Sequence, residues 1–280
     1  MIWIFLSIIA LTIFGLLTWQ WIDRRTDSQV WSELIARSEE GCAVFDVAQV
    51  EGLPEPAQRY FQYMIQLGTP LMHAVEIDMQ GELGLGTASR PNYRPMRARQ
   101  ILVPPHGLVW DLKSGMIRGS DGITPATSWT RFWLFNLIPI VRVGGGADHH
   151  RSAFGRVVSE AAFWVPASLL PSNHVSWESV NQTTARATVT FAGFEQAVDI
   201  TVAENGQPTQ VMILRWSNEN PEREFREQPF GGELSGFKKF GGYTLPTRVV
   251  GGNHFGTQEY FPFYKADVTD IRFPGSQSRN

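Results

Sequence analysis

The stretch 75–80 reads VEIDMQ, and its residues alternate between apolar and polar. Val75, Ile77 and Met79 fall on one side of an extended chain, and the polar residues between them fall on the other. A period of two is typical of a strand with one buried face. Similar stretches lie outward from it, at 97–103, 107–112, 116–119, 185–191, 197–203, 210–216, 247–251, 258–263 and 267–273. Because few helices separate these stretches, the sequence predicts one large antiparallel sheet.

Two segments have helical spacing instead. Apolar residues recur every three to four positions over 57–67, after a proline-rich entry, and again over 151–165, which ends before Pro166. The predicted fold class is therefore α+β: a large curved antiparallel sheet, or half-open barrel, packed around two or three helices on its concave face. A sheet of that shape holds either a packed core or an apolar cavity, and the sequence leaves both open.

Residues 1–22 read MIWIFLSIIALTIFGLLTWQWI and carry no charged side chain. As a helix the run would be about 33 Å long, enough to cross a hydrocarbon core of about 30 Å. Trp3 lies near one end and Trp19 and Trp21 near the other, where indole rings favour the membrane interface. The run predicts a transmembrane anchor. A cleaved signal peptide is the alternative, although the basic start and the small residues of a cleavage site are missing.

The rest of the chain divides into two further parts. Residues 23–44 are expected to form a juxtamembrane helix or linker, with apolar residues such as Trp31 and Leu34 on one side. Residues 45–280 are expected to form a single globular domain, because no low-complexity linker interrupts them. Three arginines follow the apolar run, at positions 24, 25 and 37, and by the positive-inside rule they favour a cytoplasmic domain.

Composition excludes several classes of protein. Hydrophobic residues make up 43% of the chain and charged residues 18%, so the chain can bury a core and is not disordered. A net charge of −3 offers no basic field for nucleic acid. The single cysteine, Cys42, excludes an internal disulfide and a cysteine-built zinc site.

No motif predicts a cofactor or a metal. Asp148-His149-His150 is interpreted as a solvated helix start with Asp148 as its cap, because neighbouring histidines diverge on a helix. Gly81, Gly84 and Gly86 do not have dinucleotide-loop spacing, and we interpret them as a bend or bulge in a hairpin.

Arg156 and Glu160 lie four residues apart on the second predicted helix. A solvated structural ion pair is the default interpretation. The alternative is a pair that faces a cavity, where it would orient a polar headgroup or act as a general acid and base. The chain is also rich in aromatic residues. The segment Trp129–Val143 is the best candidate to dip into the bilayer or to line an apolar pocket. The candidate ligand-binding residues are Arg156, Glu160, Trp164, Trp133, Phe135, Trp110 and Trp216.

Several blocks together resemble an uncharacterised bacterial domain-of-unknown-function family of membrane-anchored proteins. They are Leu53-Pro54-x-Pro56-x-Gln58-Arg59-Tyr60, Pro104-Pro105-x-Gly107-x-Val109-Trp110, Arg156-x-x-x-Glu160-Ala161, Trp164-x-Pro166, and Phe240-Gly241-Gly242-Tyr243-x-Leu245-Pro246. The resemblance covers about residues 45–273 and implies no activity. It implies an architecture similar to the half-open barrel of periplasmic lipoprotein carriers, which hold acyl chains against a curved sheet. That likeness implies a domain at the inner membrane and outside the cytoplasm. The three arginines after the apolar run favour the opposite side.

Three functions are therefore weighed. A membrane-anchored protein that binds a lipid or another hydrophobic ligand at the bacterial envelope is favoured. A structural protein that docks a membrane partner through an apolar patch is the first alternative. An envelope enzyme that uses Glu160 as acid or base and Arg156 as an anion clamp is the second.

Overall fold

The computed structural model describes residues 1–38 and 43–274, so Cys42 lies outside the described part of the chain. Thirteen strands form one antiparallel sheet in the order β6-β5-β4-β3-β2-β1-β15-β14-β11-β10-β9-β8-β7. The strands are β1 (Val75–Gly84), β2 (Tyr93–Val103), β3 (Gly107–Ser114), β4 (Ile117–Ile123), β5 (Ser128–Leu134), β6 (Ile138–Gly144), β7 (Val175–Ser179), β8 (Thr184–Phe191), β9 (Phe194–Val202), β10 (Pro208–Ser217), β11 (Arg226–Ser235), β14 (Arg248–Asn253) and β15 (Phe261–Arg272). A separate hairpin joins β12 (Lys238–Phe240) to β13 (Tyr243–Leu245).

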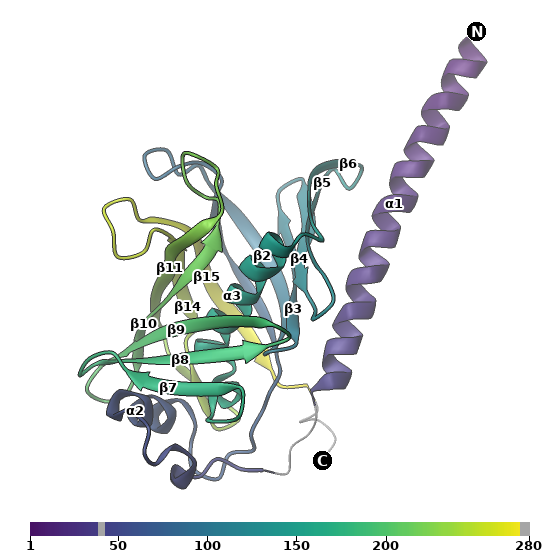
Figure 1. Ribbon diagram of the computed structural model, residues 1–280. Helices are drawn as coiled ribbons and strands as arrows, with labels where there is room; N and C mark the ends of the chain where they lie inside the picture. The colour runs from purple at the N-terminus through teal and green to yellow at the C-terminus, as the bar shows by residue number, and fades with distance from the viewer. Residues whose placement is uncertain (39–42, 275–280) are drawn as a thin grey trace.

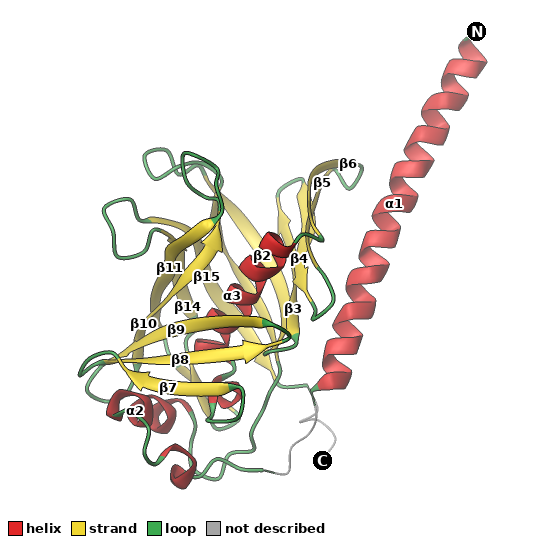
Figure 2. Cartoon of the chain, viewed as in Figure 1, coloured by secondary structure: helices red, strands yellow, loops and turns green. Residues whose placement is uncertain are grey.

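The sheet curls around one helix (Figures 1 and 2). Helix α3 (Ala147–Trp164) lies along the concave side and contacts strands from both halves of the sheet, including β10, β9, β5 and β4. Helix α2 (Glu55–Met64) closes the lower end, where the Tyr60 hydroxyl donates to the carbonyl of Ala162 over 2.8 Å. The predicted half-open barrel of α+β class is confirmed, with α3 on its inner side and α2 across one end.

Helix α1 (Ile2–Arg37) lies on the other side of the sheet. Successive residues of a strand point to opposite faces, so strands β2 and β3 contribute side chains both to the main core and to the packing of α1. Leu102 and Leu108 join the main core, whereas their neighbours Ile101, Val103 and Val109 pack against Val30 and Leu34 of α1. The second half of α1 is therefore held by a small apolar cluster on the outer face of the sheet.

A cluster of charged and polar groups fixes the same helix further toward its N-terminus. Asp23 accepts two hydrogen bonds from the Arg142 guanidinium, at 2.6 and 3.0 Å, and one from the Trp133 indole at 3.1 Å. Asp27 accepts from the Ser120 hydroxyl at 2.7 Å. Arg24 donates to Asn136 in the β5–β6 turn at 2.9 Å. These bonds set the direction in which residues 2–22 leave the domain.

The segment 129–143 forms the hairpin β5–β6 at the edge of the sheet. Its turn residues Phe135 and Asn136 both have positive φ angles, 54° and 57°, as the two central residues of a type I′ turn do. Phe135, Ile138, Ile140 and Val143 are exposed along this edge. The hairpin lies beside α1 in Figure 1, and the Trp19 and Trp133 rings meet edge to face at 5.7 Å.

Two local predictions differ from the structure. The stretches 258–263 and 267–273 belong largely to one long strand, β15, which pairs with β14 between Phe261 and Asp267 and with β1 between Tyr264 and Arg272. Helix α3 starts at Ala147 rather than at 151, with Gly146 as its N-cap, so Asp148 lies inside the first turn and is not the cap.

Candidate functional site

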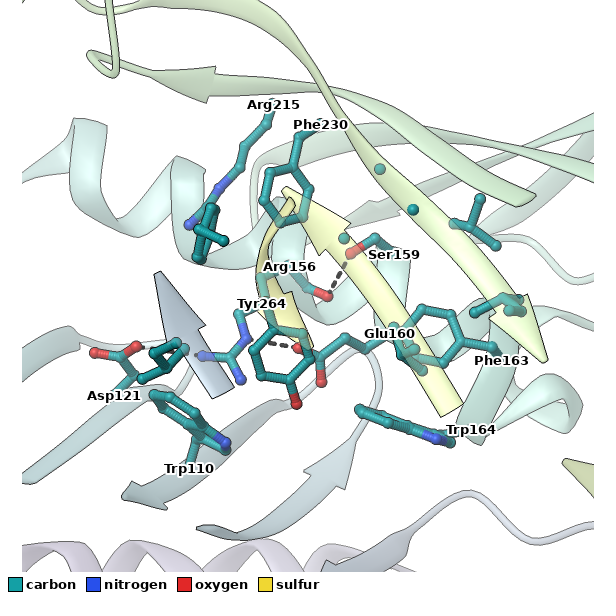
Figure 3. A pocket seen from close by; sticks show the side chains of 18 residues that line it. Trp110, Asp121, Arg156, Ser159, Glu160, Phe163, Trp164, Arg215, Phe230 and Tyr264 are labelled. Carbon is teal, nitrogen blue, oxygen red and sulfur yellow. Dashed lines mark hydrogen bonds and ion pairs between the residues drawn. The ribbon is translucent and has the colours of Figure 1, made fainter. Parts of the chain in front are cut away.

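The concave side of the sheet is only partly filled. Toward its lower end α2, α3 and the strands form a continuous apolar core, with Tyr60, Phe61 and Val157 fully buried. Beside this core, a cavity of about 150 Å³ lies between the C-terminal half of α3 and strands β10, β11, β14 and β15 (Figure 3). Its apolar wall includes Leu83, Phe163, Trp164, Val211, Phe230, Leu234, Val249 and Phe263. The sheet therefore holds both a packed core and an apolar cavity.

Paired glycines leave one wall of this cavity without side chains. Gly231 and Gly232 of β11 lie opposite Gly252 and Gly251 of β14, and three of the four line or adjoin the cavity. A Cβ added at Gly232 would lie 2.3 Å from the carbonyl oxygen of Val250, so no larger residue fits where the strands approach. Glycine in a strand interior typically marks such a bend or close approach. These two Gly-Gly pairs were visible in the sequence, and our sequence analysis missed their meaning.

A buried polar cluster forms another part of the wall. Arg156 Nε donates to Glu160 at 2.6 Å, and its two terminal nitrogens donate to Asp121 at 3.3 Å and to Gln100 at 3.1 Å. Gln100, fully buried on β2, also donates to the second oxygen of Glu160. The guanidinium lies over the Trp110 ring at 5.0 Å. The cluster spans α3, β2, β3 and β4, and it holds both Glu160 oxygens in hydrogen bonds.

The Arg156–Glu160 pair is not solvated. The two side chains are 15% and 12% exposed, so the default interpretation of a surface pair is wrong and the cavity-facing alternative describes the geometry. Burial alone would lower the pKa of Arg156, but Glu160 and Asp121 outweigh it and raise that pKa above its ordinary value. Arg156 therefore stays charged, with two carboxylates as partners.

Four of the seven candidate residues meet at this cavity, namely Trp110, Arg156, Glu160 and Trp164 (Figure 3). The other three lie elsewhere. Trp133 is buried against α1, and Phe135 is exposed at the hairpin turn. Trp216 donates to Asp148 at 2.7 Å near the start of α3. Residue spacing placed the α3 residues together, but it did not say which side of the sheet each tryptophan faces.

Arg215 also lines the cavity and was missed. The sequence could have shown this, because residues two apart in a strand face the same side. Arg215 therefore faces the same side as Val211 and Ile213, both of which are buried on the inner face of β10. The Arg215 Nε donates to the hydroxyl and the carbonyl of Ser152, at 3.1 and 3.3 Å. The guanidinium lies over the Phe230 ring at 4.9 Å.

The indole N–H groups of Trp110 and Trp164, also in the wall, are buried and have no hydrogen-bond partner within residues 1–38 and 43–274. Each uncompensated buried donor costs free energy, on the order of 1–3 kcal/mol. Among the described residues of this wall, Asp121 Oδ1 is likewise a buried acceptor without a donor.

A second hollow, of about 360 Å³, lies between α1 and the outer face of the sheet. Its lining includes Asp23, Asp27, Arg118 and Arg131. Burial raises the pKa of the Asp27 carboxyl to about 6, against the smaller effects of Ser120 and Arg131. The polar side chains of this hollow hold α1 on the sheet. A lining this polar does not suit an apolar ligand.

The histidines near α3 make ordinary hydrogen bonds. The two ring nitrogens of His149 contact the hydroxyls of Ser128 and Thr130, at 2.7 and 3.1 Å, and His150 contacts the carbonyl of Thr124 at 2.9 Å. They are therefore partly buried and not at a solvated helix start. Within the described residues, no three His, Cys, Asp or Glu side chains gather as metal ligands would.

Helix α1 is long and apolar enough to cross a membrane, a test that a signal sequence at an N-terminus also passes. Its residues from Met1 to Ile22 are almost all exposed, and the helix continues without a break into the part that packs on the sheet. The apolar half of α1 therefore extends away from the domain with few contacts to it.

Comparison with known proteins gives a family and three similar folds. A model described as a family of unknown function (DUF6544) matches residues 43–266. No curated protein matches the chain.

Among solved structures, the chain is similar to a LolA superfamily protein from Nitrosomonas europaea, with 9% identity and a TM-score of 0.44 over 79% of this chain and 93% of that one. It is similar to a putative outer membrane lipoprotein-sorting protein domain from Vibrio parahaemolyticus, with 14% identity and a TM-score of 0.40 over 82% and 96%. It is also similar to a DUF1329 family protein from Desulfovibrio piger, with 9% identity and a TM-score of 0.40 over 89% and 94%. The expected membership of an uncharacterised family is confirmed by the family match, which spans most of the globular part: the chain belongs to the DUF6544 family of unknown function.

Proposed function

We propose that this protein is a membrane-anchored binding protein that takes the apolar part of a lipid, or of another hydrophobic ligand, into the cavity beside α3. The observation that carries the proposal is the cavity itself. Its wall is mostly apolar and aromatic, and a few polar groups converge on one side, which is the usual composition of a small-molecule site.

The size of the cavity limits what enters it. An apolar cavity of about 150 Å³ accommodates a group the size of benzene. We therefore expect a short section of an acyl chain, or a ring, to be held inside, with the rest of the ligand outside. Burying a large apolar group contributes about 1.5–3 kcal/mol, so binding of moderate strength follows.

The polar cluster supports binding over catalysis. Both oxygens of Glu160 are occupied, by Arg156 and Gln100, and Asp121 also contacts Arg156. Both carboxylates thus contact the Arg156 guanidinium, and each oxygen of Glu160 already accepts a hydrogen bond. The cluster instead gives the wall a fixed shape.

The proposal includes an anchor at residues 1–22, a juxtamembrane segment at 23–44 and a globular domain over 45–280. The hairpin β5–β6 supports membrane contact beside that anchor. Its tip is hydrogen-bonded to α1 through Asn136 and Arg24, two residues beyond the end of the apolar run, and Phe135 is 60% exposed. An exposed aromatic side chain at that level fits the membrane interface. The loops after β1, β10 and β14 lie at the same end of the half-barrel (Figure 1).

Photolabelling tests the proposal. The full-length chain in detergent is irradiated with a fatty alcohol that carries a photoreactive diazirine in its chain, and labelled peptides are mapped by mass spectrometry. We expect label on the cavity strands β10, β11 and β14, in addition to residues 1–22 in the micelle. Label confined to residues 1–22 and the β5–β6 hairpin would overturn the proposal.

Two fusions decide which side of the membrane holds the domain. An active alkaline phosphatase at the C-terminus would place it outside the cytoplasm, as the carrier likeness implies. A fluorescent fusion without phosphatase activity would place it inside, as the arginines after the apolar run imply.

A further inference from the structure

Arg215 differs from the other cation in the cavity wall. Arg156 contacts two carboxylates, whereas the hydrogen bonds of Arg215 to other residues of the described ranges 1–38 and 43–274 run through Nε alone, to Ser152. Within the described residues, no carboxylate lies in ion-pair distance of the Arg215 guanidinium. Its two terminal nitrogens are therefore donors without a protein acceptor, beside an apolar cavity.

Holding this charge there is unfavourable for the protein alone. Burial, and then the positive charge of Arg156, lower the pKa of Arg215 to about 10, while Asp121 and Glu160 act on it only from beyond contact distance. At neutral pH the group is still protonated. A partly buried cation without a counter-ion destabilises a fold, and an apolar residue of similar size would be tolerated better.

Arg215 lies at one side of the cavity and the apolar groups extend away from it. In Figure 3 the Arg215 and Arg156 side chains lie toward one side, and Phe163 and Trp164 toward the other. Val211, on the same face of β10, continues the apolar wall from Arg215. The guanidinium of Arg215 thus lies next to an apolar cavity of a kind that suits a hydrocarbon chain.

We propose that the ligand is a single-chain amphiphile with an anionic group, a carboxylate or a phosphate, which binds the terminal nitrogens of Arg215 while the chain enters the apolar cavity. This inference rests on the proposed function and names the ligand class for the same site. Guanidinium forms paired, charge-assisted hydrogen bonds with both kinds of oxyanion, and the low polarity of the wall strengthens them. The nearby carboxylates of Asp121 and Glu160 contact Arg156 and lie beyond ion-pair distance of Arg215.

Matched probes test the inference on the full-length chain in detergent. Three diazirine probes share one hexadecyl chain and end in a carboxylate, a phosphate or a neutral alcohol. Their affinities are compared from the concentration dependence of labelling on β10, β11 and β14. A charge-assisted hydrogen bond contributes about 1.5–3 kcal/mol, so we expect at least one anionic probe to bind about tenfold or more tightly than the alcohol. The anion with the higher affinity identifies the headgroup.

Two variants and a control assign the preference to Arg215. Arg215→Met should abolish the preference for the anion, leave alcohol binding within about twofold, and leave the midpoint of thermal unfolding unchanged or raised. Arg215→Lys should retain part of the preference. Arg248→Gln removes an exposed arginine of β14 and should change nothing.

The two ways of failing are distinguishable. If the alcohol and both anions bind the wild-type cavity equally, or if Arg215→Met keeps the preference, the inference about the headgroup is wrong while the proposed function stands. If none of the three probes labels the cavity strands of the wild-type chain, the proposed function itself is wrong.

Discussion

Two valine-to-phenylalanine substitutions compare the cavity with the packed core. Val249 lines the cavity on β14, and Val198 lies in the solid core on β9. Both side chains are buried, so the pair differs mainly in the free volume beside each valine. Each substitution adds four carbon atoms of ring to the same kind of position in a strand.

The expected energies have opposite signs. Four more buried carbons contribute about 3 kcal/mol where room exists, at about 0.8 kcal/mol for each CH₂-sized group. The 150 Å³ beside Val249 offers that room, so Val249→Phe should leave the free energy of unfolding unchanged or raise it. Val198→Phe has no such space and should lower the free energy of unfolding by about 1–3 kcal/mol through overpacking.

Two measurements follow from the same pair. Chemical denaturation in detergent gives the stabilities, and photolabelling with the diazirine alcohol gives occupancy of the cavity. Val249→Phe should lose most label on β10 and β11, whereas folded Val198→Phe should keep it. If Val249→Phe destabilises the protein as much as Val198→Phe does, the space beside Val249 is not available. If it keeps full labelling of those strands, the ligand binds elsewhere.

Three other perturbations test the polar contacts. Glu160→Gln leaves Arg156 with a single carboxylate and should lower the free energy of unfolding by about 3–5 kcal/mol. Glu222→Gln, at an exposed ion pair, is the control and should have no effect. Equal stabilities for the two variants would contradict the buried pair. Because the folded-state pKa of Asp27 is raised to about 6, its contribution to stability is fully present below about pH 4 and is lost as pH rises through 6. Asp27→Asn should therefore gain stability relative to wild type between pH 4 and 8, by about 3 kcal/mol at most, in denaturation series at each pH, and a constant difference would refute this. Phe135→Ser should reduce quenching of Trp133 by brominated lipid in nanodiscs without changing stability, and unchanged quenching would place the hairpin outside the bilayer.

The architecture followed from periodicity, and the exceptions have physical causes. The alternation at Val75, Ile77 and Met79 marks a strand with one buried face, and these three residues are indeed in the core. Residues 101–103 of β2 and 107–110 of β3 are buried on both faces, because α1 covers the outer side, so in this part the apolar run does not show which face each residue lies on. The segment 129–143 is mostly apolar for a different reason, since β6 is an edge strand whose apolar residues remain exposed.

The sequence predicted the relative positions of site residues that share one helix or strand, but it did not predict contacts between residues of different elements. The spacing of Arg156 and Glu160 placed them on one helix face, but whether that face met solvent depended on Gln100 and Asp121, which come from strands far away in the sequence. Arg215 could have been assigned to the inner face by its parity with Val211 and Ile213. The cavity could not have been predicted, because it depends on how closely β11 and β14 approach each other at their glycine pairs.

The most direct measurement is a crystal structure of the full-length protein with a bromine-labelled fatty acid. An anomalous bromine peak between α3 and the glycine-lined wall of β11 and β14, with the carboxylate at Arg215, is the predicted result. Bromine found only around residues 1–22, with the space beside Val249 and Leu234 closed by the protein's own side chains, would contradict the account.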